Sequence, residues 1–164
     1  MQNFEMIGAG EQFKSELYDM ISGITLFSDL GSSEMQQLAS YLQAYRAPAG
    51  SVIFSEGEPA SYICVLQSGA VDIVKDDARG ESKTVATVGA GKTLGEMAVV
   101  DGEPRSATCV AKKDCVLLLL TRENFQRIVH HYPGLAVKLL VVIAKLLSQR
   151  LRQASGVLVD YLDG

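Results

Sequence analysis

Between Arg46 and Thr121 the chain is a series of short segments rich in β-forming residues, and this pattern restricts the fold more than any other feature. Turn sequences such as Gly57-Glu58-Pro59 and Ser68-Gly69 separate the segments. The clearest of these predicted strands cover 51–54, 62–67, 71–75, 84–88, 107–111 and 115–121. Strands this short, at such even spacing, favour a sandwich, roll or barrel over a parallel α/β sheet.

Helical patterns flank this β-rich part on both sides. Apolar residues recur at three- and four-residue steps over 33–45, after a shorter helical piece around 15–21, so the first 45 residues are expected to be helical. After Thr121 a short helix should end before Pro133, and a long helix should cover 134–152. We therefore divide the chain into an N-terminal helical segment (1–25), one domain that includes the long helix (26–152) and a tail (153–164).

The long helix carries more apolar surface than one neighbour can cover. One seam contains Leu135 and Leu139, and a second seam beside it contains Leu140, Leu147 and Leu151. The pattern fits packing on the helix's own domain and a shared homodimer interface equally well, and the sequence does not choose between them.

Composition and charge narrow the functional classes. The 164 residues are 48% hydrophobic and 21% charged, as in a single folded domain, and the net charge of −4 gives no general attraction for nucleic acid or anionic lipid. The N-terminus lacks a signal-peptide pattern, and the apolar stretch 135–147 is short and interrupted by lysines. We expect a cytoplasmic protein with reduced cysteines and no membrane span. We also expect no DNA partner, because too few residues follow the long helix to form a helix-turn-helix.

The segment 95–108 carries the chemistry. Gly95 and Ala98 are small residues at the start of a single helical turn, where free backbone N–H groups can approach an anion. Asp101-Gly102 and Pro104 then reverse the chain and return Arg105 to the same turn. Because a guanidinium can engage two phosphate oxygens at once, this arrangement predicts a phosphate site.

Glu96 needs a different partner within that site. A carboxylate repels phosphate and accepts hydrogen bonds only, whereas a ribose 2′-hydroxyl can donate one. Glu96 together with Arg105 therefore predicts a ligand that contains both a ribose and a phosphate.

This segment resembles the phosphate-binding cassette of cyclic nucleotide-binding domains, the family that includes catabolite activator proteins and regulatory subunits of cyclic-AMP-dependent kinase. Gly-Glu-Met-Ala-Val at 95–99 and Pro-Arg-Ser-Ala-Thr at 104–108 match the family pattern without gaps. Further resemblance at 48–59 and 65–69 extends the match over about residues 26–152.

The resemblance implies a mainly β fold with flanking helices (α+β). Its centre would be an eight-stranded double-stranded β-helix, or jelly-roll, with N-terminal helices and a long C-terminal helix. The ligand would lie inside the roll. Cyclic AMP is the favoured ligand, and cyclic GMP stays open because the hydroxyl of Ser106 could bond a syn guanine. No cofactor, metal or catalytic residue is implied, and an effector protein would act in trans.

The resemblance also implies the roles of individual residues. Arg105 would bind the exocyclic phosphate oxygens and Glu96 the 2′-hydroxyl, Asp72 would orient Arg105 from behind, and Val99 would pull the C-terminal helices over the base when the ligand closes the cassette. The implied ligand-binding set is Gly95, Glu96, Met97, Ala98, Pro104, Arg105, Ser106 and Ala107.

Other interpretations remain beside this one. The roll could have lost its ligand and serve as a protein-interaction module, or the cassette could be a surface loop in which Arg105 only pairs with a neighbouring acid. Residues 86–93 resemble a relaxed nucleotide-triphosphate loop, but no substantial helix follows them. A cupin-type metalloenzyme would share the rolled architecture, but His130 and His131 are the only histidines and lie on a helix after the strands.

Overall fold

Two antiparallel sheets form the centre of the molecule, as seen in a computed structural model that describes residues 4–162, without the side chains of Ala98 and Val99. One sheet has the strand order β1-β2-β9-β4-β7 and the other the order β3-β8-β5-β6. The strands are β1 (Glu5–Ala9), β2 (Gln43–Ala47), β3 (Val52–Phe54), β4 (Tyr62–Ser68), β5 (Ala70–Asp76), β6 (Ser82–Gly89), β7 (Thr93–Leu94), β8 (Thr108–Ala111) and β9 (Cys115–Thr121).

Strand β9 contains a continuous apolar run at residues 115–120, and its pairing with β4 explains why the run does not alternate with polar residues. In their register Ile63 faces Leu120 and Cys64 faces Leu119, so neighbouring pairs point to opposite faces of the sheet. Leu118, Leu120, Ile63 and Val65 pack against the helices, whereas Leu117, Leu119, Cys64 and Leu66 pack between the two sheets. Both faces of these strands are buried, and both therefore need apolar side chains.

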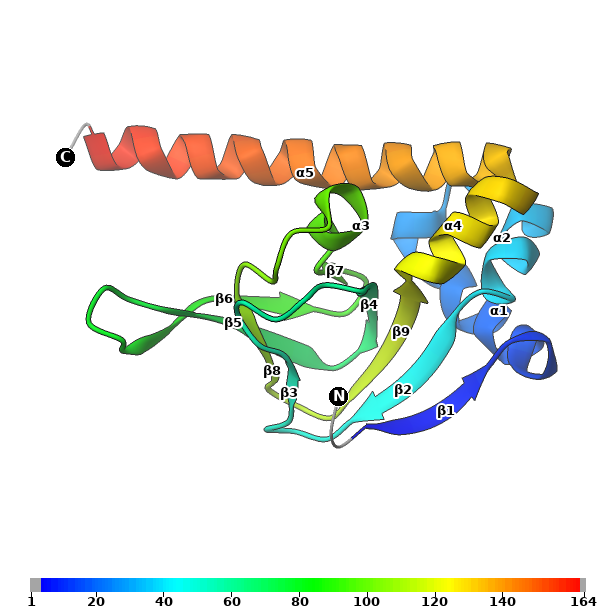
Figure 1. The fold of residues 1–164 in the computed structure, drawn as a ribbon, viewed down its shortest axis with the longest axis horizontal. Coiled ribbons are helices and arrows are strands. Elements are labelled where there is room, and N and C mark those ends of the chain that lie inside the picture. The colour runs from blue at the N-terminus through cyan, green and yellow to red at the C-terminus, as the bar shows by residue number, and fades with distance from the viewer. Residues whose placement is uncertain (1–3, 163–164) are drawn as a thin grey trace.

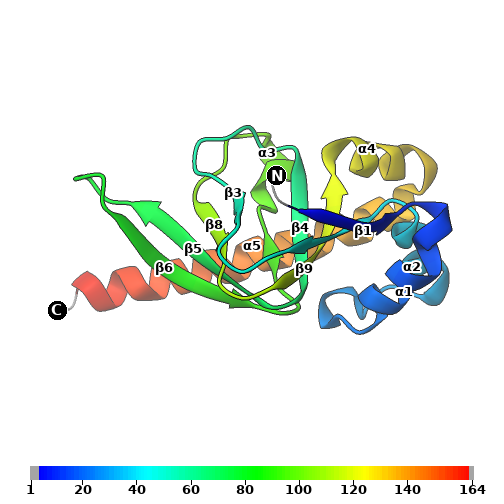
Figure 2. The ribbon, with the colours of Figure 1, turned by 90° about the horizontal axis from the view of Figure 1, so that it is seen from below.

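The helices are α1 (Lys14–Ser22), α2 (Ser32–Ala39), α3 (Met97–Asp101), α4 (Arg122–His131) and α5 (Pro133–Leu162), with short 3-10 turns at Glu11–Phe13 and Thr25–Phe27. Helices α1, α2 and α4 gather at one end of the strands and, with the first half of α5, cover the outer face of the first sheet, whereas α3 lies nearer the middle of the molecule (Figure 1). Seen from below, the C-terminal half of α5 extends in the same direction as the projecting β5–β6 hairpin (Figure 2).

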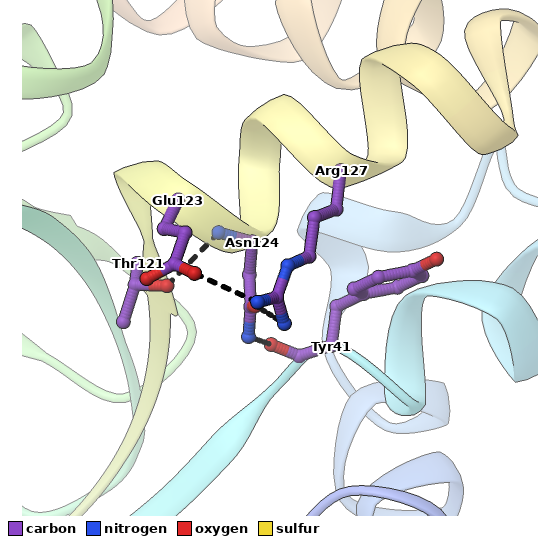
Figure 3. A network of polar contacts seen from close by, with 5 residues as sticks. All are labelled: Tyr41, Thr121, Glu123, Asn124 and Arg127. Carbon is purple, nitrogen blue, oxygen red and sulfur yellow. Dashed lines mark hydrogen bonds and ion pairs between the residues drawn. The ribbon is translucent and has the colours of Figure 1, made fainter.

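A polar network fixes the start of α4 to the turn that follows α2. The Thr121 hydroxyl accepts a hydrogen bond from the Asn124 backbone N–H over 3.1 Å and so caps the helix. The Asn124 side chain donates to the Tyr41 carbonyl over 2.8 Å, and Arg127 pairs with Glu123 at 2.7 Å (Figure 3). The strand β9 therefore passes into α4 at a defined angle, directly after the roll.

The fold class expected from the sequence is confirmed. Strands β2 to β9 are the eight strands of the expected roll, and β1 adds a ninth within the described residues. The expectation that the first 45 residues are helical is wrong at two places, because β1 lies in that range, α2 ends at Ala39 and β2 begins at Gln43. Residues 43–47 form a strand because their backbone pairs with β1 on one side and with β9 on the other. This pairing outweighs the local helical pattern.

The C-terminal helix is also longer than expected. It was expected over 134–152 with a tail after it, but α5 continues to Leu162. Its last buried residue is Ile143, so the second half of the helix extends beyond the hydrophobic core. The short strand β7, which pairs with β4 just before the cassette, was not expected from the sequence either.

Candidate functional site

A cavity of about 670 Å³ lies between the strands, the cassette segment and the second half of α5. Its walls are largely apolar where β5, β6 and β8 contribute, and polar where the cassette and α5 meet. The lining residues from the strands and the β7 turn are Phe54, Ile73, Ala86, Val88, Thr93, Leu94 and Cys109. Arg150, Gln153, Ala154 and Val157 line it from α5.

Arg105 is a buried cation at this cavity, with only 5% of its surface exposed. Its Nη2 donates to the Tyr62 carbonyl over 2.7 Å and its Nη1 to the Gly95 carbonyl over 3.3 Å. The guanidinium also lies 4.0 Å from the centre of the Phe54 ring and 4.6 Å from that of Tyr62. These neutral partners orient the guanidinium but leave its charge uncompensated.

The charge on Arg105 therefore favours an anion in the cavity. Among the described residues it forms no salt bridge, and its Nε has no hydrogen-bond partner. An unpaired charge away from water is costly, and a bound phosphate oxygen would relieve that cost. The backbone is held from both sides, because Arg105 N–H donates to the Glu58 carbonyl and the Gly57 N–H donates to the Arg105 carbonyl, each over 2.8 Å.

Gly95 is required by the position of this guanidinium. Its φ of +73° lies in the left-handed region, and a Cβ atom there would collide with Nη1 of Arg105. A glycine is therefore needed at this position both for the backbone conformation and for the close approach of Arg105.

Glu96 is fully buried and already has two partners. The Thr93 hydroxyl donates to its Oε2 over 3.2 Å, and Nη1 of Arg150 donates to its Oε1. Nη2 of Arg150 also donates to the Thr93 carbonyl over 3.1 Å. Burial lowers the pKa of Arg150, whose side chain is still 47% exposed.

The thiols near the cavity are neutral at physiological pH. Burial raises the pKa of both Cys64 and Cys109 to about 12, although the charge of Arg105 opposes the shift. All three cysteines are free and buried. Cys109 therefore contributes apolar wall to the cavity and not a nucleophile.

The family model for the cyclic nucleotide-binding domain matches residues 45–132, which is more than half of the chain. The chain belongs to this family. A cyclic AMP receptor protein from Thermus thermophilus is 34% identical over 134 residues, which are 82% of this chain and 60% of that protein. A cAMP-dependent protein kinase regulatory subunit from Yarrowia lipolytica is 33% identical over 73% of this chain and 30% of its own length. The chain thus spans less than two thirds of the length of these curated relatives.

Solved structures that contain cyclic nucleotide-binding domains superpose on most of this chain. A cyclic nucleotide-binding domain from Methylobacillus flagellatus superposes with a TM-score of 0.83 and 32% identity, over 96% of this chain and 89% of that one. The Thermus thermophilus catabolite activator protein gives a TM-score of 0.71 and 34% identity over 84% of this chain and 62% of that one. Other relatives include a cyclic nucleotide-gated potassium channel from Mesorhizobium japonicum, 31% identical over 73% of this chain and 32% of that protein.

In the part of the chain that the structure describes, no helix is both long and apolar enough to cross a bilayer.

The structure brings most of the expected cyclic nucleotide site together. Gly95, Glu96, Met97, Pro104, Arg105, Ser106 and Ala107 all line the cavity. The side chains of Ala98 and Val99 lie outside the described part, so the role expected of Val99 stays a prediction. Arg150 and Gln153 were not expected, since sequence pattern alone does not show that a residue 54 positions after Glu96 reaches it.

Asp72 does not have the contact that was expected. Its carboxylate accepts a hydrogen bond from the Thr87 hydroxyl over 2.6 Å, and no hydrogen bond to Arg105 occurs among the described residues. The neighbours Val71 and Ile73 point into the roll, so strand alternation directs Asp72 to the outer face. The carbonyls of Tyr62 and Gly95 orient Arg105 in its place.

The structure also bears on the alternative interpretations. Arg105 is buried and bonded to carbonyls, so the cassette is not a surface loop held by an exposed ion pair. Residues 86–93 run from β6 into β7, and the next helix, α3, has five residues and begins only at Met97, unlike a nucleotide-triphosphate loop. His131 bonds Tyr41 at the helical end over 3.0 Å, and within 4–162 no cluster of metal-binding side chains was found.

Proposed function

We propose that this chain is a regulatory sensor domain that binds cyclic AMP in the cavity and performs no catalysis. The observation that carries the proposal is the buried guanidinium of Arg105, which lines the cavity and has only neutral partners among the described residues. One such cation suits the single negative charge of a cyclic phosphodiester. The names of the relatives from Thermus thermophilus and Yarrowia lipolytica favour cyclic AMP over cyclic GMP.

The remaining parts of the cavity suit the rest of the nucleotide. Glu96 is the acceptor for the ribose hydroxyl, and the apolar wall of Ile73, Ala86 and Val88 suits the face of a purine. Gln153, from α5, offers an amide donor and acceptor to the polar edge of the base.

The output of the sensor would pass through α4 and α5. Apolar residues of α5 stay exposed along its outer side, including Leu140 (43%), Leu151 (69%) and Leu158 (59%). We propose that this side forms a homodimer interface and that an effector protein reads the helix position in trans. The free cysteines support a cytoplasmic setting.

Titration calorimetry of the purified chain with cyclic AMP, cyclic GMP and 5′-AMP tests the proposal. We expect saturable binding of cyclic AMP, weaker binding of cyclic GMP and the weakest binding of AMP, because AMP carries a second negative charge and lacks the ring. A chain that binds none of the three would contradict the sensor function.

A protein-interaction module without ligand is the second candidate, and one observation favours it. Arg150 occupies the carboxylate of Glu96 that a ribose would need. The same titration separates the two candidates, since the module predicts no heat of binding for any nucleotide.

A further inference from the structure

Two aromatic rings enclose the guanidinium of Arg105 inside the roll. Its Cζ lies 4.0 Å from the centre of the Phe54 ring and 4.6 Å from the centre of the Tyr62 ring. Both distances are within the range, up to about 6 Å, in which an aromatic face attracts a cation. The two rings meet edge to face, with 6.4 Å between their centres and 70° between their planes. The cation therefore lies against two ring surfaces of different orientation.

The connection between β3 and β4 fixes both rings relative to Arg105. Phe54 ends β3 and is only 5% exposed, and Tyr62 begins β4. The Tyr62 hydroxyl donates to the Ile53 carbonyl over 3.2 Å, which ties the second ring to the strand that carries the first. The loop between the two strands is bonded to the backbone of Arg105 in both directions. One short stretch of chain thus holds the rings and the cation together.

Arg105 has no carboxylate to orient it among the described residues. Its two side-chain hydrogen bonds go to backbone carbonyls, and the one to Gly95 is long at 3.3 Å. Glu96, the buried acid of the cavity, pairs with Arg150 instead. A carboxylate partner would compete with a ligand for the guanidinium, whereas an aromatic ring attracts the cation without neutralising it. The rings can therefore orient Arg105 and leave its charge for an anion.

We propose that Phe54 and Tyr62 are positioning residues, an aromatic clamp that holds Arg105 in its binding orientation before the phosphate of the ligand arrives. The effect of the clamp on affinity rests on the proposed function, whereas the ordering of Arg105 can be measured in the protein alone. An arginine side chain has several rotatable bonds, and ordering it at the moment of binding weakens affinity. The clamp strengthens binding because the guanidinium is already fixed.

Phe54→Leu removes the nearer ring and keeps an apolar side chain. We expect the Kd of cyclic AMP to rise about three- to tenfold, the range expected when one long side chain must be ordered on binding. Phe27→Leu is the matched control, because Phe27 is 6% exposed in the other core cluster and does not line the cavity. Its Kd should equal that of the wild type. Equal affinity of Phe54→Leu and the wild type would overturn the clamp.

A fluorinated ring at position 54 isolates the electrostatic attraction from the loss of volume. Fluorine withdraws charge from the face of the ring and changes its shape little, so 3-fluoro- and 3,5-difluorophenylalanine weaken the attraction for a cation in steps. Both leave Cζ, which lies against Gly95, unchanged. We expect the Kd of cyclic AMP to rise along the series. A constant Kd would mean that the ring only fills space.

Nuclear magnetic resonance relaxation of the Arg105 Nε–H, in the full chain without ligand, measures the ordering itself. We expect a high order parameter in the wild type and a lower one in Phe54→Leu, with the exposed Arg79 as the mobile reference in each sample. An Nε–H that stays ordered in the variant would contradict the clamp, since Phe54 would then act on the ligand alone. If the wild type binds no cyclic nucleotide, the proposed function fails, and the order parameters still decide whether the rings hold Arg105.

Discussion

Arg105 is the residue whose chemistry matters most, because it combines burial, a fixed orientation and an unpaired charge. Replacing it with lysine keeps the charge but removes the planar fork and the contact with the Phe54 ring. We expect cyclic AMP affinity to fall by more than about tenfold in Arg105→Lys and further in Arg105→Ala, since a desolvated charge-assisted bond contributes about 2 kcal/mol or more.

Calorimetry with a fold check by circular dichroism measures this loss. Arg79→Lys is the matched control, because Arg79 lies at the exposed tip of the β5–β6 hairpin. This variant should bind cyclic AMP as tightly as the wild type does. Retained affinity in both Arg105 variants would remove Arg105 from phosphate recognition.

For single residues, the sequence predicted the part of the site that lies in the cassette segment and missed the part that α5 contributes. Glu96 and Arg105 lie in one short segment, so local turn chemistry and the spacing of charged residues were enough to group them, whereas Ser106 came from the resemblance. Arg150 and Gln153 come from a helix whose register on the roll depends on packing over the whole chain. Asp72 was misplaced because its role came from the resemblance, whereas strand alternation directs its side chain outward.

The cassette, as an element, depends on a backbone that only glycine allows beside Arg105. Gly95→Ala should cost about 1–2 kcal/mol from its left-handed backbone and should also displace the guanidinium, because the new Cβ collides with Nη1. We expect a strong loss of cyclic AMP binding in a protein that still folds, measured by calorimetry and thermal unfolding.

Gly91→Ala separates these two effects. Gly91 also has a positive φ, +84°, but nothing lies within 4 Å of the position of its Cβ. The unfolding free energy of the Gly91→Ala variant should fall by a similar amount, about 1–2 kcal/mol, while its affinity for cyclic AMP stays unchanged. Equal losses of affinity in the two variants would show that strain, and not the displaced guanidinium, impairs binding.

The elements themselves were predicted best where local pattern and tertiary pairing agree. Strands β4, β5, β6 and β9 were found because runs of β-formers end at clear turns. Residues 43–47 were misread because Leu42 and Tyr45 continue the three- and four-residue spacing of α2, although the pairing with β9 makes the segment a strand. The end of α5 was missed because its last residues lack a packed face, which is the signal that marks a helix within a core.

For the whole molecule, the exposed side of α5 is the feature that an isolated copy does not explain. Leu140, Leu147, Leu151 and Leu158 follow coiled-coil spacing, and all but Leu147 are exposed. If α5 pairs with a second copy, Leu151→Glu should raise the dimer dissociation constant by at least about tenfold, because a charge would be buried in an apolar seam. Sedimentation velocity over a concentration series measures this change.

Gln149→Glu is the control for added charge, because two residues along the helix place it about 200° away from Leu151. It should leave the dimer intact. A wild-type chain that stays monomeric at high concentration would contradict the interface, and the unassigned apolar side would then need another partner.

The unbroken length of α5 gives it a mechanical property. From Ile143, its last buried residue, to Leu162 the helix rises by about 28 Å, at about 1.5 Å per residue. A tilt of about 10° around that pivot would carry the far end through about 5 Å, roughly the height of one helical turn. Such a lever would convert a small rotation of α5 beside the cavity into a displacement as large as a side chain.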